Sequence, residues 1–373
     1  MKELIKGVSG KLLRVSPRSH WIMVTVRTSA GRAGFGEASL HFSENAVVAA
    51  VASLGSHLTG LGVAEALRRI SSLEPGDLIT TSARCALDQA LHDLEAQRLE
   101  YPICRLLERE PARRLEVYAN INRRTLDRTP RGFAQSARDA VAAGFSALKI
   151  APFDDLTPDH DVDAASPLLE AGFARMAAVR DAMGPERRLL VDCHWRLSPG
   201  MIEPVADACA ALGVFWLETP YPEDDDRRPD IAQARRACNA RDVLLAGAEL
   251  KIGRPAFEAM IAAGCYDVLM PDMKYVGGYS QFMAVAGAAE QAGVAISPHN
   301  PTGPICHAHS VQASAAITPF LILEMQFDET AAFKAIVEGA LPMPRAGFLD
   351  VSEKPGLGLR LIDVSMAAFE TTA

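Results

Sequence analysis

The spacing of hydrophobic residues changes part-way along this chain. Residues 1–40 contain runs such as WIMVTVRT and GFGEASL, in which apolar and polar positions alternate. This pattern predicts a three-stranded antiparallel meander. Residues 45–109 instead carry apolar residues at helical spacing, most regularly over 83–97. Together the two stretches predict a small α+β capping domain over residues 1–112.

Short apolar runs alternate with alanine-rich helical stretches over residues 113–342. Eight strand–helix units of this length predict a (β/α)8 TIM-type barrel. An open doubly wound sheet is the alternative. It is disfavoured because no glycine-rich phosphate turn follows the first strand. Residues 343–373 contain the β-like run PGLGLRLIDV, and we expect this segment to return to the capping domain.

Acidic residues stand at the ends of three successive predicted strands. Asp192 follows LLV, Glu218 follows VFWL and Glu249 follows VLLAGA. The active site of a parallel barrel lies at the carboxyl ends of its strands, so these acids should converge. Any one of them could be a helix cap or a loop charge, but three together would repel unless a cation intervenes. Oxygen ligands with open positions suit Mg²⁺.

Other strand ends carry groups that could move a proton. Asp272 and His299 end the sixth and seventh strands, and a carboxylate beside an imidazole raises its basicity. We therefore expect this pair to act as a general base. His194 lies two residues beyond Asp192 and would face the same mouth if the strand continues, where it could donate a proton.

Lys149 ends the second barrel strand and Glu324 ends the eighth. Because Glu324 would lie near other acids, its pKa should rise, and it could donate a hydrogen bond as a neutral acid. The residue that shares a face with Lys149 is Ala151, so no second lysine accompanies it. Lys251 and Lys274 fall outside the apolar register of the strand ends, which disfavours a Schiff-base aldolase.

Residues that could contact the far end of a substrate come from two places. The loop SPRSHW lies between the first two strands of the small domain, and NIN ends the first barrel strand. The candidates are Arg18, His20, Trp21, Asn120 and Asn122.

Composition narrows the class of protein further. The chain has 373 residues with a net charge of −8 and no basic cluster, which argues against a nucleic-acid partner. Its seven cysteines form no CxxC pair and indicate reduced thiols in a cytoplasmic protein. The N-terminal residues lack the apolar core of a signal peptide, and no apolar run is long enough to cross a membrane.

These residues together resemble the enolase superfamily, in its mandelate racemase/muconate lactonizing enzyme-like group. The resemblance rests on GFGEAS, the three strand-end acids, MPD…GG around Asp272, PHNPTGP around His299, and PGLGL. Within the group, VDCHWRLSP and PHNPTGPI are especially similar to sugar-acid dehydratases of the galactonate type.

The resemblance implies a role for each strand-end group. The three acids would bind Mg²⁺. His299, paired with Asp272, would remove the proton next to the substrate carboxylate, and His194 would protonate the departing hydroxyl. Lys149 and Glu324 would stabilise the enolate. The product would be a 2-keto-3-deoxy acid made from a sugar acid, and relatives of this kind are commonly homo-oligomers.

One departure from the family pattern favours elimination. Racemases of the group carry a second lysine where this chain has Ala151, so racemisation between two opposed bases is disfavoured. Two alternatives stay open: an epimerase or cycloisomerase acting on a sugar acid, and a sugar-acid-binding protein without activity. The identity of the sugar acid, an aldonate or an aldarate, is also open.

Overall fold

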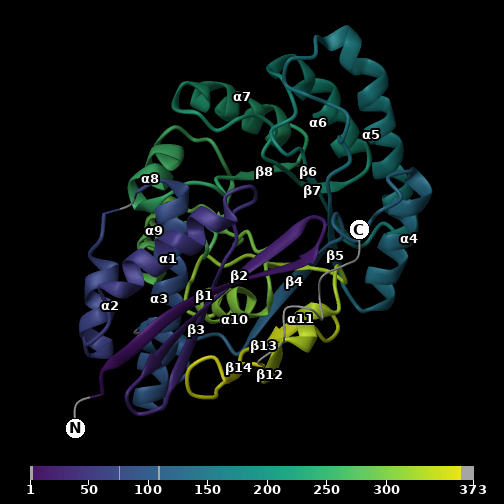
Figure 1. Cartoon of the computed structure of the whole chain (residues 1–373). Helices are drawn as coiled ribbons and strands as arrows, with labels where there is room; N and C mark the ends of the chain where they lie inside the picture. The colour runs from purple at the N-terminus through teal and green to yellow at the C-terminus, as the bar shows by residue number, and fades with distance from the viewer. Residues whose placement is uncertain (1–2, 75, 108–109, 363–373) are drawn as a thin grey trace.

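The computed structural model describes residues 3–74, 76–107 and 110–362. Within the predicted C-terminal segment, residues 363–373 lie outside this part of the chain. The described residues form a small α+β domain whose long β1–β2 hairpin reaches across to a barrel of strands and helices (Figure 1).

The small domain is the predicted antiparallel meander, covered on one face by helices. Gly34 and Gly36 bring the sheet directly onto the third helix: a Cβ at Gly36 would lie 1.9 Å from the carbonyl oxygen of Ala86. A larger residue at either position would therefore force the two layers apart. The elements are β1 (Ile5–Ser16), β2 (Ser19–Thr28), β3 (Ala33–Ala38), α1 (Glu44–Ser56), α2 (Val63–Ser71) and α3 (Leu78–Leu99).

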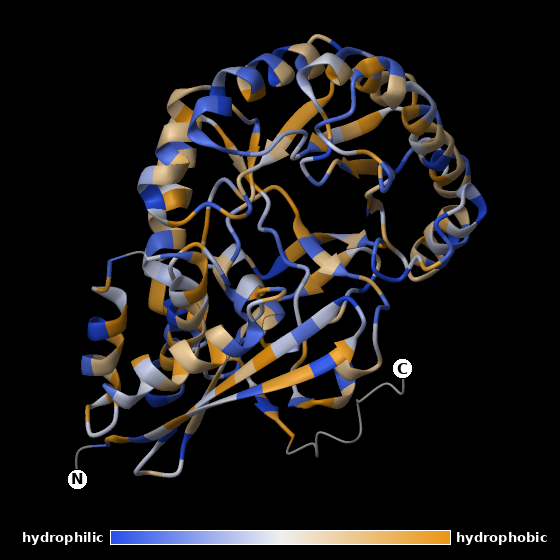
Figure 2. Cartoon of the chain, turned by 45° about the horizontal axis from the view of Figure 1, so that its top comes forward, coloured by the Kyte–Doolittle hydropathy of each residue, from blue (hydrophilic) through white to orange (hydrophobic). Residues whose placement is uncertain are grey.

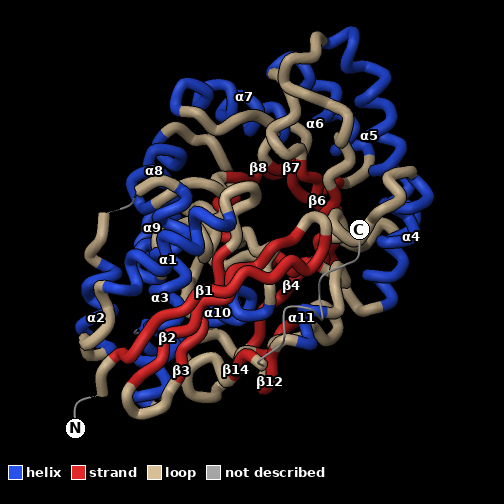
Figure 3. Tube along the Cα trace, viewed as in Figure 1, coloured by secondary structure: helices blue, strands red, loops and turns tan. Residues whose placement is uncertain are grey.

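The second part is the predicted barrel, in which eight parallel strands form a ring (Figure 3). The eighth strand pairs with the first, and a parallel bridge between Ile296 and Phe320 joins the seventh to the segment before the eighth. The strands are β4 (Arg114–Asn120), β5 (Ala147–Ile150), β6 (Arg188–Asp192), β7 (Val214–Glu218), β8 (Leu244–Gly247), β9 (Val268–Leu269), β10 (Ala295–Ile296) and β11 (Leu323–Gln326).

Helices surround the strands, and apolar residues of the strands and of the inner helix faces meet between the two layers (Figure 2). Side chains also fill the ring itself, where Tyr118 packs edge-on against Trp216 with 5.5 Å between ring centroids. The barrel is thus a packed core with its open site at one end. The helices are α4 (Pro130–Ala142), α5 (Val162–Met183), α6 (Ile202–Ala211), α7 (Arg228–Asn239), α8 (Gly253–Ala262), α9 (Tyr279–Ala292), α10 (Pro304–Ser314) and α11 (Ala332–Ala335).

The C-terminal segment touches both parts. Strand β13 (Phe348–Asp350) pairs with barrel strand β4, and β12 (Val337–Gly339) pairs with β14 (Leu359–Leu361). The backbone N–H of Leu357 donates to Asp93 on α3 of the small domain. The segment therefore extends the barrel sheet before it reaches the small domain. The domain limits at residues 112 and 342 remain our proposal.

The cysteines are free thiols, as the sequence predicts. All seven cysteines are buried and none forms a disulfide. Burial raises the pKa of Cys85 and of Cys238 to about 12, so these thiols stay protonated. No helix among the described residues has the length and apolar character needed to cross a bilayer.

Candidate active site

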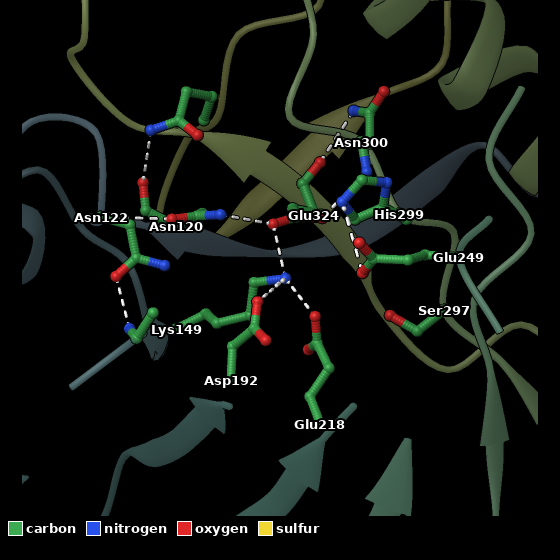
Figure 4. A network of polar contacts seen from close by, with 12 residues as sticks. Asn120, Asn122, Lys149, Asp192, Glu218, Glu249, Ser297, His299, Asn300 and Glu324 are labelled. Atoms are coloured by element: carbon green, nitrogen blue, oxygen red, sulfur yellow. Dashed lines mark hydrogen bonds and ion pairs between the residues drawn. The ribbon is translucent and has the colours of Figure 1, made fainter. Parts of the chain in front are cut away.

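Neighbouring strand ends bring the ionisable residues to one mouth of the barrel (Figure 4). Asp192 and Glu218 are direct partners in the parallel register of β6 and β7. Lys149 lies on the adjacent strand β5, and Glu249 follows β8 by two residues. Glu324 comes from β11, on the other side of β4. All five side chains are buried, so their charges must be balanced within the site.

Lys149 occupies the centre of this group. Its Nζ donates to Glu218 Oε1 at 2.6 Å, and it lies 2.9 Å from Glu324 Oε1 and 3.7 Å from Asp192 Oδ2. Burial lowers the pKa of Lys149, but the carboxylates around it, Glu218 first, raise it well above the usual value. The ammonium is therefore a permanent buried cation.

One cation does not balance the carboxylates around it. Burial, and then repulsion from Asp192, raises the pKa of Glu249 well above its usual range. Burial also raises the pKa of Glu218 more than Lys149 lowers it. Glu249 Oε2 is buried and receives no hydrogen bond. Burial raises the pKa of Asp192, but His194 and Lys149 lower it overall, so this acid stays ionised. Glu218 and Glu249 are thus short of positive charge, and a set of three buried carboxylates in which one oxygen is unused fits a hard dication such as Mg²⁺.

The three acids are not tightly grouped. Among the described residues, one group of three His, Cys, Asp or Glu side chains has ligand atoms that all lie within 4.8 Å of one another. It consists of His20, His41 and Glu44. The oxygens of the acids are therefore spread more widely. Coordination of one ion by all three would require their oxygens to come closer together.

His299 and Asp272 form a close pair at the same mouth. His299 Nδ1 lies 2.6 Å from Asp272 Oδ2, and His299 Nε2 lies 3.5 Å from Glu249 Oε2. Asp272 raises the pKa of His299 as expected, but burial lowers it by more, so the pKa lies below its usual value. A neutral imidazole with Nδ1 engaged leaves Nε2 free to accept a proton.

Lys274 is the functional-site residue that sequence reasoning missed. Its Nζ lies 2.8 Å from Asp272 Oδ2, and its backbone N–H donates to Asp272 Oδ1 at 2.7 Å. Burial raises the pKa of Asp272, but Lys274, and then His299, lower it overall, so this buried carboxylate stays ionised. Asp272 opens a turn in which its side chain accepts from the backbone N–H two residues on, and a lysine at that second position was the available signal.

His194 reaches the site by a different route from the one expected. Strand β6 ends at Asp192, and His194 and Trp195 have φ of 47° and 58°, so the chain turns and the predicted continued strand is wrong. This turn brings His194 Nε2 to 3.0 Å from Asp192 Oδ2. The His194 side chain is 43% exposed, unlike the buried acids next to it.

Glu324 does not have the protonation state expected from the sequence. Burial alone would raise its pKa, but Lys149, His299 and the backbone N–H of Asn300 lower it overall. Asn120 Nδ2 also donates to Glu324 Oε1 at 2.7 Å. The predicted neutral acid is therefore wrong, and Glu324 is a carboxylate that accepts hydrogen bonds.

The two asparagines at the end of β4 and just beyond it are engaged within the protein. Asn120 binds Glu324, and its Oδ1 accepts from the backbone N–H of Asn122. Asn122 Oδ1 accepts from the N–H of Ala151 at 2.5 Å, whereas its Nδ2 is buried without a hydrogen-bond partner. Asn120 therefore acts on the site through Glu324, and the side-chain NH2 group of Asn122 is unused.

The other three substrate candidates line a small pocket beneath the loops of the small domain. Arg18, His20 and Trp21 share this pocket with His299 and Lys274. Arg18 Nη1 donates to the carbonyl of Asn122, which ties the β1–β2 hairpin to the barrel. The pocket therefore connects the hairpin loop to the proposed base.

Two family models match this chain. The description "Enolase C-terminal domain-like" matches residues 132–364, and "Mandelate racemase / muconate lactonizing enzyme, N-terminal domain" matches residues 14–108.

Curated relatives are similar along most of the chain. A D-gluconate dehydratase of Thermoproteus tenax is 30% identical over 91% of this chain and 68% of its own length. A D-galactonate dehydratase of Variovorax paradoxus is 27% identical over 93% and 90%. A D-xylonate dehydratase of Haloferax volcanii is 26% identical over 91% and 83%.

Solved structures share the fold. A mandelate racemase/muconate lactonizing enzyme from Jannaschia sp. CCS1 superposes with a TM-score of 0.86 at 23% identity, covering 99% of this chain and 98% of that one. An enolase superfamily member from Salmonella Typhimurium gives 0.85 at 21% identity, covering 97% of both chains. The chain therefore belongs to the mandelate racemase/muconate lactonizing enzyme family of the enolase superfamily.

Proposed function

We propose that this protein is a Mg²⁺-dependent sugar-acid dehydratase, a hydro-lyase that converts an aldonate or aldarate into a 2-keto-3-deoxy acid. The observation that carries the proposal is the His299–Asp272 pair, in which a partly buried imidazole lies 2.6 Å from a buried carboxylate at the same barrel mouth as three buried acids. Relatives named as gluconate, galactonate and xylonate dehydratases support the substrate class.

Proton removal falls to His299. Its Nδ1 is bound to Asp272, so Nε2 accepts the proton from the carbon next to the substrate carboxylate. Asp272 fixes the required tautomer and stabilises the imidazolium that forms. Lys274 keeps Asp272 ionised for this purpose.

Negative charge then develops on the substrate carboxylate. Asp192, Glu218 and Glu249 would hold Mg²⁺, which when bound supplies positive charge against this carboxylate. Lys149 adds a second, fixed cation in a site shielded from water. Glu324, an acceptor 2.9 Å from Lys149 Nζ, keeps that ammonium in place.

His194 assists the loss of the β-hydroxyl as a proton donor. It gives a proton to the hydroxyl oxygen as the C–O bond breaks, so water leaves and an enol forms. The enol then takes up a proton at the neighbouring carbon and becomes the ketone. The partial exposure of His194, beside the buried acids, suits a group that must reach a departing hydroxyl.

A screen of aldonic and aldaric acids with Mg²⁺, read out as 2-keto-3-deoxy acid formation, tests the proposal. His299→Asn and His194→Asn should abolish product, and His57→Asn, an exposed histidine at the end of α1, should not. Chelation should stop turnover and Mg²⁺ should restore it. Absence of a keto acid from every substrate, or turnover that survives chelation, would overturn the proposal. Exchange of the α-proton in D₂O without loss of hydroxyl would instead identify an epimerase or cycloisomerase.

A further inference from the structure

The two helices that follow the base pair begin without caps of their own. Helix α9 starts seven residues after Asp272, and α10 starts five residues after His299. Their N-cap residues are Gly278 and Gly303, which have no side chain to bind the first backbone N–H groups. These N–H groups need acceptors, because the first turn of a helix leaves them without intrahelical partners.

Glu37 of the small domain supplies the acceptors for α10. Its carboxylate accepts from Gly303 N at 2.6 Å, from Ile305 N at 3.1 Å and from Cys306 N at 3.0 Å. The hydroxyl of Thr302 adds a fourth hydrogen bond at 2.7 Å. Glu37 lies on β3 and is fully buried, so a whole carboxylate is committed to this helix start.

Asp88 of the small domain does the same for α9. Its Oδ2 accepts from the backbone N–H of Tyr279 at 2.8 Å. Asp88 lies on α3 and is buried, and His92 and Ser71 hold its position. A carboxylate at a helix N-terminus is also favoured by the helix dipole.

The glycines at these helix starts admit the carboxylates. A Cβ on Gly278 would lie 2.7 Å from the Asp88 carboxylate, and a Cβ on Gly303 would lie 2.8 Å from both oxygens of Glu37. Helices α4 and α5 differ, because Thr129 and Asp161 cap them from within the barrel. The two helices next to the base pair, in contrast, are capped by carboxylates of the other domain.

A third contact links these caps. Gln89, next to Asp88 on α3, accepts from the backbone N–H of Glu37 at 2.9 Å and donates to the carbonyl of Met273 at 3.1 Å. Met273 lies between Asp272 and Lys274. The small domain therefore holds both segments that carry the base pair.

We propose that Glu37 and Asp88 are positioning residues for proton abstraction, and that the small domain sets the geometry of His299 and Asp272 by capping α10 and α9. This inference rests on the proposed function for its meaning in catalysis. The capping residues contact the segments that follow Asp272 and His299. The three acids proposed to bind the metal lie at other strand ends, on β6 and β7 and after β8. Loss of a cap should therefore lower kcat and leave KM nearly unchanged.

The test compares Glu37→Gln and Asp88→Asn with a matched control, Asp93→Asn. Asp93 is also a buried carboxylate of α3 that accepts two backbone N–H groups, but those belong to Phe35 and Leu357, away from the base pair. We expect kcat to fall about 100-fold in the two capping variants, the size of effect that a small misplacement of reacting groups produces. The control variant should lose stability but keep the kcat of the parent.

A second readout needs no substrate. The proton on His299 Nδ1, in its 2.6 Å hydrogen bond to Asp272, should give a downfield proton resonance that is absent from His299→Asn. This resonance should shift or vanish in the capping variants and persist in Asp93→Asn. Should Glu37→Gln fail to fold, Asp88→Asn tests the same idea at the other helix.

Folded capping variants with an unchanged resonance and unchanged kcat would overturn the inference, and so would an equal loss of both in Asp93→Asn. If the parent dehydrates no sugar acid, the proposed function fails, and the resonance alone decides whether the small domain positions the base pair.

Discussion

Substitution of Lys274 by methionine tests whether the Lys274–Asp272 pair is a buried ion pair that the site depends on. Methionine keeps most of the volume and removes the ammonium, which leaves Asp272 buried with the imidazole of His299 as its remaining side-chain hydrogen-bond partner. At the observed 2.8 Å, an effective dielectric of about 20 gives a gross attraction of about 6 kcal/mol. Desolvation of both groups offsets part of this attraction, and removal of one member of a buried pair typically destabilises by about 3–5 kcal/mol.

The assay is urea denaturation of the parent, Lys274→Met and the double variant Lys274→Met/Asp272→Asn. The double variant should be more stable than Lys274→Met, because it no longer buries an uncompensated charge. Lys6→Met, an exposed lysine on β1, should change the free energy of unfolding by less than about 0.5 kcal/mol.

The difference between parent and Lys274→Met should also depend on pH. The folded-state pKa of Asp272 is lowered, so its contribution to stability is present above the unfolded pKa, near pH 4, and is lost as pH falls further. A loss below about 1 kcal/mol at pH 7, the range of surface pairs, would refute the reasoning. A double variant less stable than Lys274→Met would refute it as well.

Three further predictions follow from burial and charge. Burial raises the pKa of Asp93 to about 6, so the parent should lose on the order of 3 kcal/mol of stability between about pH 4 and about pH 7. Asp93→Asn should not show this loss. If urea denaturation gives the same dependence of stability on pH for both proteins, the prediction is contradicted. Burial lowers the pKa of His307 to about 4, so the parent should lose stability as pH falls from about 6.5 to about 4. His307→Asn should lose less stability over this range in the same assay. Mg²⁺ should raise the Tm of the parent more than that of Glu249→Gln, because the variant lacks a carboxylate with an unused buried oxygen; equal shifts by scanning fluorimetry would rule out Glu249 as a ligand.

The sequence could locate strand-end residues because the topology of a parallel barrel leaves them little freedom. Once eight strand–helix units were recognised, Asp192 and Glu218 had to emerge at the same mouth, and they are register partners. Periodicity was enough for the meander and for α3, where apolar spacing marks the buried face. Short strands such as β9 and β10, of two residues each, also followed from this alternation.

Protonation states could not be predicted in this way. The pKa of Glu324 falls because Lys149 from β5 and the N–H of Asn300 lie against it, and the sequence separates these groups widely. The pKa of His299 falls because its desolvation outweighs its carboxylate partner. Both depend on distances between segments, and pattern along one segment carries no information about them.

The sequence by itself thus determined the order of elements, the barrel and the residues at its strand ends, because each of these follows from local periodicity and a topology with one open end. Only the tertiary structure decided that Lys274 shares Asp272 with His299, that His194 enters on a turn, and that Glu37 caps a helix 266 residues away. Burial and charge act through space, so residues remote in the chain set the chemistry of this site.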